Sequence, residues 1–214
     1  MNTAALRAQI QRALDHEAAS GELARQLDSH LDRLHPAIQL PADDTHGALQ
    51  RFVAAYVEQV PDVLDAANAV AREAGIEGQV KPVLRLAEQF FLSPPDVLEG
   101  HQGLDALLDE AYLAHRLVEE VNDRYIVHLG QPLIPLDTTV ANVITHQLIG
   151  EPFANQLDEA VHHAVEEMLD DSVFRQDSVQ AYRTRLNDPQ TTAAWQSWPC
   201  LSRRLGVELG LPVA

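Results

Sequence analysis

Apolar residues recur every three or four positions along almost the whole chain, which is the spacing of one face of an α-helix. The series Leu23, Leu27, Leu31 and Leu34 shows this spacing most clearly. We find no convincing alternation of apolar and polar residues, the pattern that is typical of a half-buried strand. The sequence therefore predicts an all-α protein, folded as a compact bundle of eight or nine helices.

Prolines, glycines and polar clusters divide this pattern into separate helices. Pro61 either starts a new helix or kinks the one before it, because its missing N–H is harmless only in a first turn. The longest periodic segment, 103–129, would span about 40 Å as a helix, so we expect it to be central. The predicted helices cover residues 2–19, 22–34, 46–60, 61–74, 79–92, 103–129, 138–149, 152–170 and 177–186.

The chain has 214 residues, of which 46% are hydrophobic, and this is enough to bury one continuous core. We therefore expect a single helical domain over 1–214, with no internal repeat. Segment 1–35 should form a helical pair whose narrow leucine stripes make it peripheral or dimerising. Segment 187–214 should be a C-terminal tail that packs as a short helix and then frays.

The charge balance limits the classes of partner. The chain carries 15 basic and 32 acidic residues, a net charge of −17, and Lys81 is its only lysine. Without a cluster of basic residues, such a chain repels phosphate backbones and anionic lipid surfaces. We therefore expect no nucleic acid and no membrane as partners, whereas a homo-oligomer or a protein partner is compatible with the charge.

Targeting signals and cysteine usage bear on the compartment. The N-terminal segment carries charges throughout and lacks the apolar stretch of a secretory signal, and no apolar run is long enough to span a bilayer. Cys200 is the only cysteine, so an internal disulfide is excluded. Together these features predict a cytoplasmic protein.

Polar residues lie near the apolar stripe of the long helix 103–129. On a helical wheel, Asn122 lies about 20° from the centre of the stripe, His115 about 40° and Glu119 about 80°. His115 and Glu119 are four residues apart, so their side chains are neighbours. They could share a metal ion, or His115 could be paired with Glu119 or Asn122 in an ordinary buried polar network.

The next helix, 138–149, carries Asn142 and His146, also four residues apart, among apolar residues. Only a short loop separates this helix from the long one, so His146 could come near His115. The metal hypothesis takes His115, Glu119 and His146 as ligands of iron, manganese or zinc, with Glu88 as a possible neighbour.

A third interpretation is a pocket for a small apolar ligand inside the bundle. Such pockets have few polar groups, which orient the ligand. The orienting residues would be Tyr112, Asn122 and Asn142.

The segment DEAVHHAVEEML contains one Glu-x-x-His motif, Glu159 to His162. The motif resembles the one that ferritin-like di-iron bundles carry on two of their four helices. Here it occurs once, and Glu159, His163 and Glu166 lie nearly opposite the apolar stripe of their helix. We therefore expect a solvated face and transfer no ligand set from that family.

No catalytic sequence motif stands out. Phosphate-binding glycine loops, His-Glu-x-x-His and Gly-x-Ser-x-Gly are absent from the sequence. Cys200 is expected to pack rather than to act as a nucleophile. The leading hypothesis is a non-catalytic interaction or regulatory protein, and the alternatives are a metal-binding oxidoreductase and a protein that binds a small apolar ligand.

Overall fold

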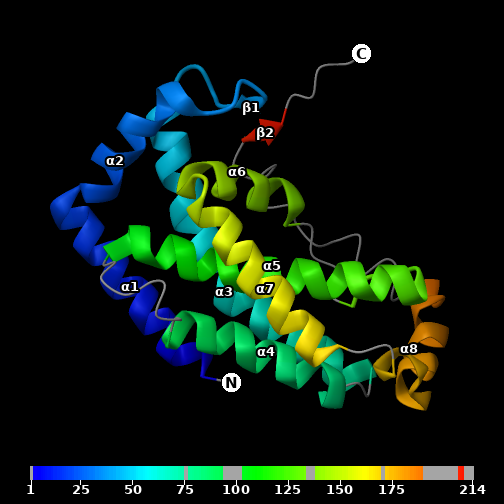
Figure 1. Ribbon diagram of the computed structural model, residues 1–214. Coiled ribbons are helices and arrows are strands. Elements are labelled where there is room, and N and C mark those ends of the chain that lie inside the picture. Colours follow the sequence, from blue (N-terminus) through cyan, green and yellow to red (C-terminus); the bar gives the residue numbers. More distant parts are fainter. Residues whose placement is uncertain are drawn as a thin grey trace.

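The computed structural model confirms the all-α fold (Figure 1). It describes residues 2–74, 77–93, 103–133, 138–169, 172–189 and 207–209. Within these ranges it contains eight α-helices, two short 3₁₀ helices and two short strands. The elements are α1 (Thr3–Ser20), α2 (Glu22–His30), η1 (Leu31–Arg33), β1 (Ile38–Gln39), α3 (Thr45–Ala74), α4 (Glu77–Leu92), α5 (Gly103–Leu129), α6 (Thr139–Ile149), α7 (Phe153–Met168), η3 (Val173–Arg175), α8 (Asp177–Leu186) and β2 (Glu208–Leu209).

Helix α5 occupies the centre of the bundle, as its length predicted. It packs against α1, α3, α4, α6 and α7, and Figure 1 shows α4, α6 and α7 arranged around it. Leu113 and Leu117 in its middle are completely buried. A helix with neighbours on so many sides places its polar residues inside the protein, where they need hydrogen-bond partners.

Helix α3 is longer than the sequence pattern predicted. It runs through Pro61 without ending, so the two helices predicted on either side of this proline are one. Pro61 has no N–H to give to the carbonyl four residues earlier, that of Val57. Burial of Val60, Val63 and Leu64 on both sides of the proline stabilises the continuous helix, since tertiary packing outweighs local propensity.

Helices α1 and α2 are joined at Gly21, whose φ of +62° is a left-handed conformation that glycine adopts without strain. Their apolar residues Leu6, Ile10, Leu23 and Leu27 are buried within this chain. Helix α1 packs on α3, α4 and α5, and α2 packs on α3. The protein's own helices therefore cover these four residues of the leucine stripes, while Leu31 and Leu34 are only partly buried.

The two strands were not predicted. Ile38 pairs with Leu209 and Gln39 with Glu208 in an antiparallel arrangement. Residues 38–39 fall in a segment predicted as a loop, and 208–209 fall in the predicted tail. Two-residue strands are too short to produce an alternating pattern, which explains why the sequence did not reveal them. Cys200 and most of the predicted tail lie outside the described residues.

Within the described part of the chain, no helix combines the length and the apolar character needed to cross a membrane.

Candidate functional site

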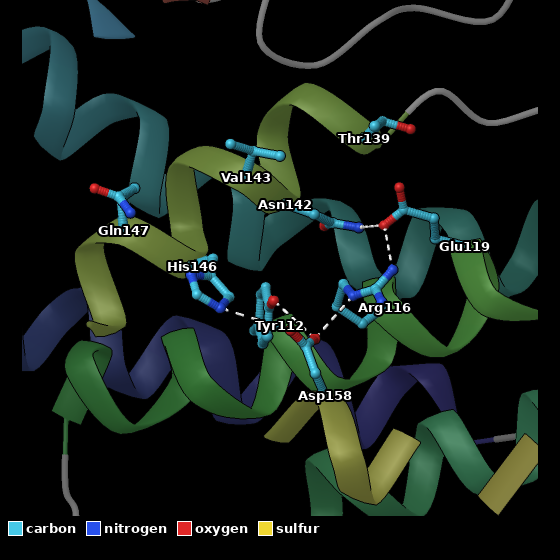
Figure 2. A pocket seen from close by; sticks show the side chains of 9 residues that line it. All are labelled: Tyr112, Arg116, Glu119, Thr139, Asn142, Val143, His146, Gln147 and Asp158. Atoms are coloured by element: carbon cyan, nitrogen blue, oxygen red, sulfur yellow. Dashed lines mark hydrogen bonds and ion pairs between the residues drawn. The ribbon is translucent and has the colours of Figure 1, made fainter. Parts of the chain in front are cut away.

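A cavity of about 250 Å³ lies where α5, α6 and α7 meet (Figure 2). Helices α5 and α6 are consecutive in the chain, while α7 returns across α5 and closes the third side. Most of the side chains that line the cavity are polar or charged. They are Tyr112, Arg116 and Glu119 from α5, Thr139, Asn142, Val143, His146 and Gln147 from α6, and Asp158 from α7.

Arg116 is held between two carboxylates. Its Nε donates to Asp158 Oδ1 at 2.9 Å, and its Nη1 donates to Glu119 Oε2 at 2.7 Å. Burial by itself lowers the pKa of Arg116, but the hydrogen bond to Asp158 and the charge of Glu119 outweigh it and raise that pKa. The guanidinium therefore stays charged and links α5 to α7.

Asn142 joins three helices through its side-chain amide. Its Oδ1 accepts the hydroxyl of Tyr56 from α3 at 2.6 Å, and its Nδ2 donates to Glu119 Oε2 at 2.5 Å. Nδ2 also lies 3.3 Å from the Thr138 hydroxyl oxygen. Because each end of the amide has a partner of the opposite kind, the orientation of Asn142 is fixed and so is that of Glu119.

Tyr112 and His146 form the opposite side of the cavity (Figure 2). The Tyr112 hydroxyl donates to Asp158 Oδ1 at 2.9 Å, and His146 Nε2 lies 3.1 Å from Asn155 Oδ1 and 3.6 Å from Asp158 Oδ2. Desolvation, followed by the charge of Asp158, raises the pKa of Tyr112. Tyr112 is therefore a hydrogen-bond donor at neutral pH, and its ring contacts His146 edge-on at 6.2 Å between centroids.

His115 lies in the core next to the cavity but does not line it. Its Nε2 donates to the backbone carbonyl of Tyr56 at 2.9 Å, and its ring packs on that of Tyr56 with centroids 4.4 Å apart. Desolvation lowers the pKa of His115 to about 4, so the imidazole is neutral. The partner of Nε2 is therefore a carbonyl of α3, whereas the sequence suggested Glu119 or Asn122 as partners of His115.

The three residues predicted as metal ligands are not brought together. His115 donates a hydrogen bond to the Tyr56 carbonyl. Glu119 accepts hydrogen bonds from Arg116 and Asn142. His146 lies next to Asp158 and Asn155. Among the described residues, no group of three or more His, Cys, Asp or Glu side chains is arranged to hold a metal ion. Glu88, the suggested neighbour, instead accepts a hydrogen bond from the backbone N–H of Asn2.

Of the three residues predicted to orient a ligand, two line the cavity and one does not. Tyr112 and Asn142 line the cavity, together with Glu119 and His146 from the metal hypothesis. Asn122 is buried but is not part of the lining. The predicted solvated face of α7 is confirmed, because Glu159, His162, His163 and Glu166 are all exposed.

Sequence reasoning missed Arg116 and Asp158, the two residues on which the network depends. A signal for Arg116 existed, since Tyr112, Arg116 and Glu119 are spaced four and three residues apart and share one flank of α5. Asp158 sits beside the apolar stripe of α7 but among charged neighbours, so nothing in the sequence distinguished it from the exposed residues that follow it.

Comparison of this chain with known protein families, with curated proteins and with solved structures finds no match.

Proposed function

We propose that this protein binds a small polar molecule in the cavity between α5, α6 and α7, and that it is a non-catalytic protein of a regulatory type. One observation carries the proposal. The polar lining is held in place by its own hydrogen bonds, so it is already arranged for a ligand before one arrives. Ligand sites are commonly preformed in this way, with a few fixed polar groups in a concave pocket.

The chemistry of the lining favours binding over reaction. The raised pKa of Tyr112 disfavours its use as a nucleophile at neutral pH. Arg116 and Asp158 are engaged with each other. Polar groups in this arrangement recognise a ligand by shape and hydrogen bonding. The proposal differs from the pocket expected from the sequence in one respect, because a lining with three charged residues suits a polar ligand better than an apolar one.

Native mass spectrometry of untagged protein tests the proposal. We expect a bound molecule of defined small mass, and we expect Val143→Phe, which fills the cavity from α6, to lose it. Val127→Phe is the matched control, because Val127 is 78% exposed and lies outside the cavity lining. Elemental analysis of the same sample reports any iron, manganese or zinc.

The proposal is contradicted by two results together. They are wild-type protein without a bound small molecule, and a metabolite panel that leaves its melting temperature unchanged. Equal ligand retention by Val143→Phe and Val127→Phe would show that a ligand binds elsewhere.

A regulatory role also implies a recipient of the signal. We propose a second copy of this chain or another protein in the cytoplasm as that recipient. Sedimentation velocity with and without the co-purified molecule tests it. A ligand-dependent change of mass supports the role, and an unchanged monomer that captures no protein from extract contradicts it.

A further inference from the structure

The cavity holds more negative than positive charge. Arg116 carries one positive charge, whereas Glu119 and Asp158 each carry a carboxylate within hydrogen-bond distance of it. A third carboxylate, that of Glu120, lies 4.0 Å from Nη2 of the same guanidinium. The positive charge of Arg116 is therefore more than balanced by its own neighbours. The remaining negative charge acts on any ligand that enters the cavity, although contact with water weakens this effect.

Glu119 offers an acceptor that the network leaves unused. Both hydrogen bonds to its carboxylate, from Arg116 and from Asn142, end on the same oxygen, Oε2. Figure 2 shows the second oxygen, Oε1, turned away from these donors, on the side of Thr139. The Glu119 side chain is 14% exposed, and a ligand N–H that binds Oε1 would take the place of water there.

The aromatic side of the cavity suits the same kind of ligand. The rings of Tyr112 and His146 both line it and meet edge-on. A cation near the face of an aromatic ring is attracted by the negative charge density of that face. The Tyr112 hydroxyl is neutral and donates to Asp158, so Tyr112 leaves the charge of the cavity unchanged.

An anionic ligand would meet the opposite conditions. Two of the Arg116 donors, Nε and Nη1, are already bonded to carboxylates. An anion that binds the remaining N–H groups of Arg116 would lie beside the carboxylates of Glu119 and Asp158, which repel it. The whole chain, with a net charge of −17, attracts cations and repels anions during encounter.

We propose that the ligand of this cavity is a small organic cation with N–H donors, a primary amine or a guanidine, whose charged group binds between Glu119 Oε1 and the rings of Tyr112 and His146 on the opposite side. This inference rests on the proposed function and specifies the ligand class of the same site. The second oxygen of Glu119 receives the N–H donors. Thr139 and Gln147 are the polar lining residues closest to solvent.

An NMR titration with three probes of similar size but different charge tests the inference. The probes are n-butylamine, n-butanol and sodium butyrate, at constant ionic strength and at a pH where the amine is protonated. The reporters are the Asn142 side-chain amide and the Val143 methyl groups. We expect saturable shifts with n-butylammonium, with affinity of about millimolar for so small a probe, and at least about tenfold weaker binding of n-butanol and butyrate.

Two substitutions of equal charge separate the site from the overall charge of the protein. Glu119→Gln removes the proposed acceptor charge and should weaken n-butylammonium binding about tenfold. Glu159→Gln removes the same charge from the exposed face of α7 and should leave binding unchanged. Gln147→Glu adds a carboxylate at the exposed rim of the cavity and should strengthen binding, so the inference stays testable if Glu119→Gln fails to fold.

The outcomes distinguish the ligand class from the function. If butyrate or n-butanol binds in this cavity as tightly as n-butylammonium, the proposal that the ligand is a cation is contradicted. The proposal that the cavity binds a small molecule is retained. If Glu119→Gln and Glu159→Gln weaken n-butylammonium equally, the amine responds only to the overall charge and the inference falls. If no probe perturbs the cavity reporters and no molecule co-purifies with the protein, the inference and the proposed function fall together.

Discussion

His115 joins the middle of α5 to the backbone of α3 through one buried hydrogen bond. Its position on the apolar face of α5 was predicted and is confirmed, since it is 1% exposed. Its partner was not predictable, because Nε2 donates to a carbonyl 59 residues away, in α3. Helical periodicity shows which side of a helix faces the core. It does not show which backbone group of another helix will form a hydrogen bond with a side chain on that side.

Replacing His115 with alanine should cost about 1–3 kcal/mol of unfolding free energy, because it removes the buried hydrogen bond to the Tyr56 carbonyl and leaves a cavity beside the Tyr56 ring. Urea unfolding at pH 7 measures the loss. His163→Ala is the control, because His163 is exposed and pairs with the exposed Glu167. Equal stability of the two variants would contradict the position assigned to His115.

The pH dependence of the His115 contribution follows from its lowered pKa. The folded protein binds this proton only near pH 4, while the unfolded chain binds it near 6.5, so acid favours unfolding. The contribution of neutral His115 to the free energy of unfolding is therefore complete above about pH 6.5 and is lost as the pH falls toward 4. We expect the stability deficit of His115→Gln to shrink over this interval, and a constant deficit would contradict it.

Glu110 should give the opposite pH dependence. It is buried at the α1–α5 contact, where Gln9 Nε2 donates to it at 3.4 Å, and desolvation followed by the charge of Asp109 raises its pKa to about 8. The folded state therefore retains a proton that the unfolded chain releases near pH 4.5. The contribution of protonated Glu110 to the free energy of unfolding is therefore complete below pH 4.5 and is lost as the pH rises toward 8.

Glu110→Gln should consequently gain stability over the wild type between pH 5 and 8.5. We expect a gain of about 1–3 kcal/mol at the upper end, a value reduced to allow for screening by solvent. Urea unfolding across this pH range provides the measurement. The exposed Glu159→Gln should show no such trend, and a flat difference for Glu110→Gln would show that its carboxyl is ionised in the folded protein.

At the scale of elements, most helices were predicted within a few residues, and the errors have identifiable causes. Helix α3 passes through Pro61 because its apolar face continues beyond the proline. Strands β1 and β2 are pairings between distant segments, and a two-residue strand has no periodicity of its own. The site follows the same rule, since Tyr112, Glu119, Asn142 and His146 were selected from spacing, whereas Asp158 becomes important only when α7 packs on α5.

The contact between Arg116 and Asp158 should stabilise the packing of α7 on α5. Asp158→Asn keeps an acceptor for the Tyr112 hydroxyl but removes the charge that faces Arg116, which is only 20% exposed. We expect a loss of about 1–2 kcal/mol, less than for a fully buried ion pair because both groups retain some contact with water.

Glu167→Gln is the matched control for this contact, because it breaks an exposed pair on the same helix, that with His163. It should change the unfolding free energy by less than about 0.5 kcal/mol. Equal effects of Asp158→Asn and Glu167→Gln in urea unfolding would show that the Arg116 contact does not stabilise the packing of α7.

At the scale of the whole molecule, buried apolar residues form one cluster that extends from Leu6 in α1 to Val207 beside β2. The sequence predicted one helical domain but treated segment 1–35 as peripheral or dimerising. In the described residues, Leu6 and Ile10 belong to the same cluster as Leu113 in α5. Elements that share one core are expected to unfold together, since neither can keep its apolar surface buried alone.

Hydrogen exchange under native conditions tests this cooperativity. We expect the amides of Leu6 and Ile10 to open with the same free energy as those of Leu113 and Leu117, within about 1 kcal/mol. Ile10→Ala should then lower protection in α1 and α5 by the same amount, whereas Arg25→Ala, on the exposed surface of α2, should lower neither. Early exchange confined to α1 and α2 would instead define 1–35 as a separate unit, free to detach and bind a partner while the cavity between α5, α6 and α7 stays intact.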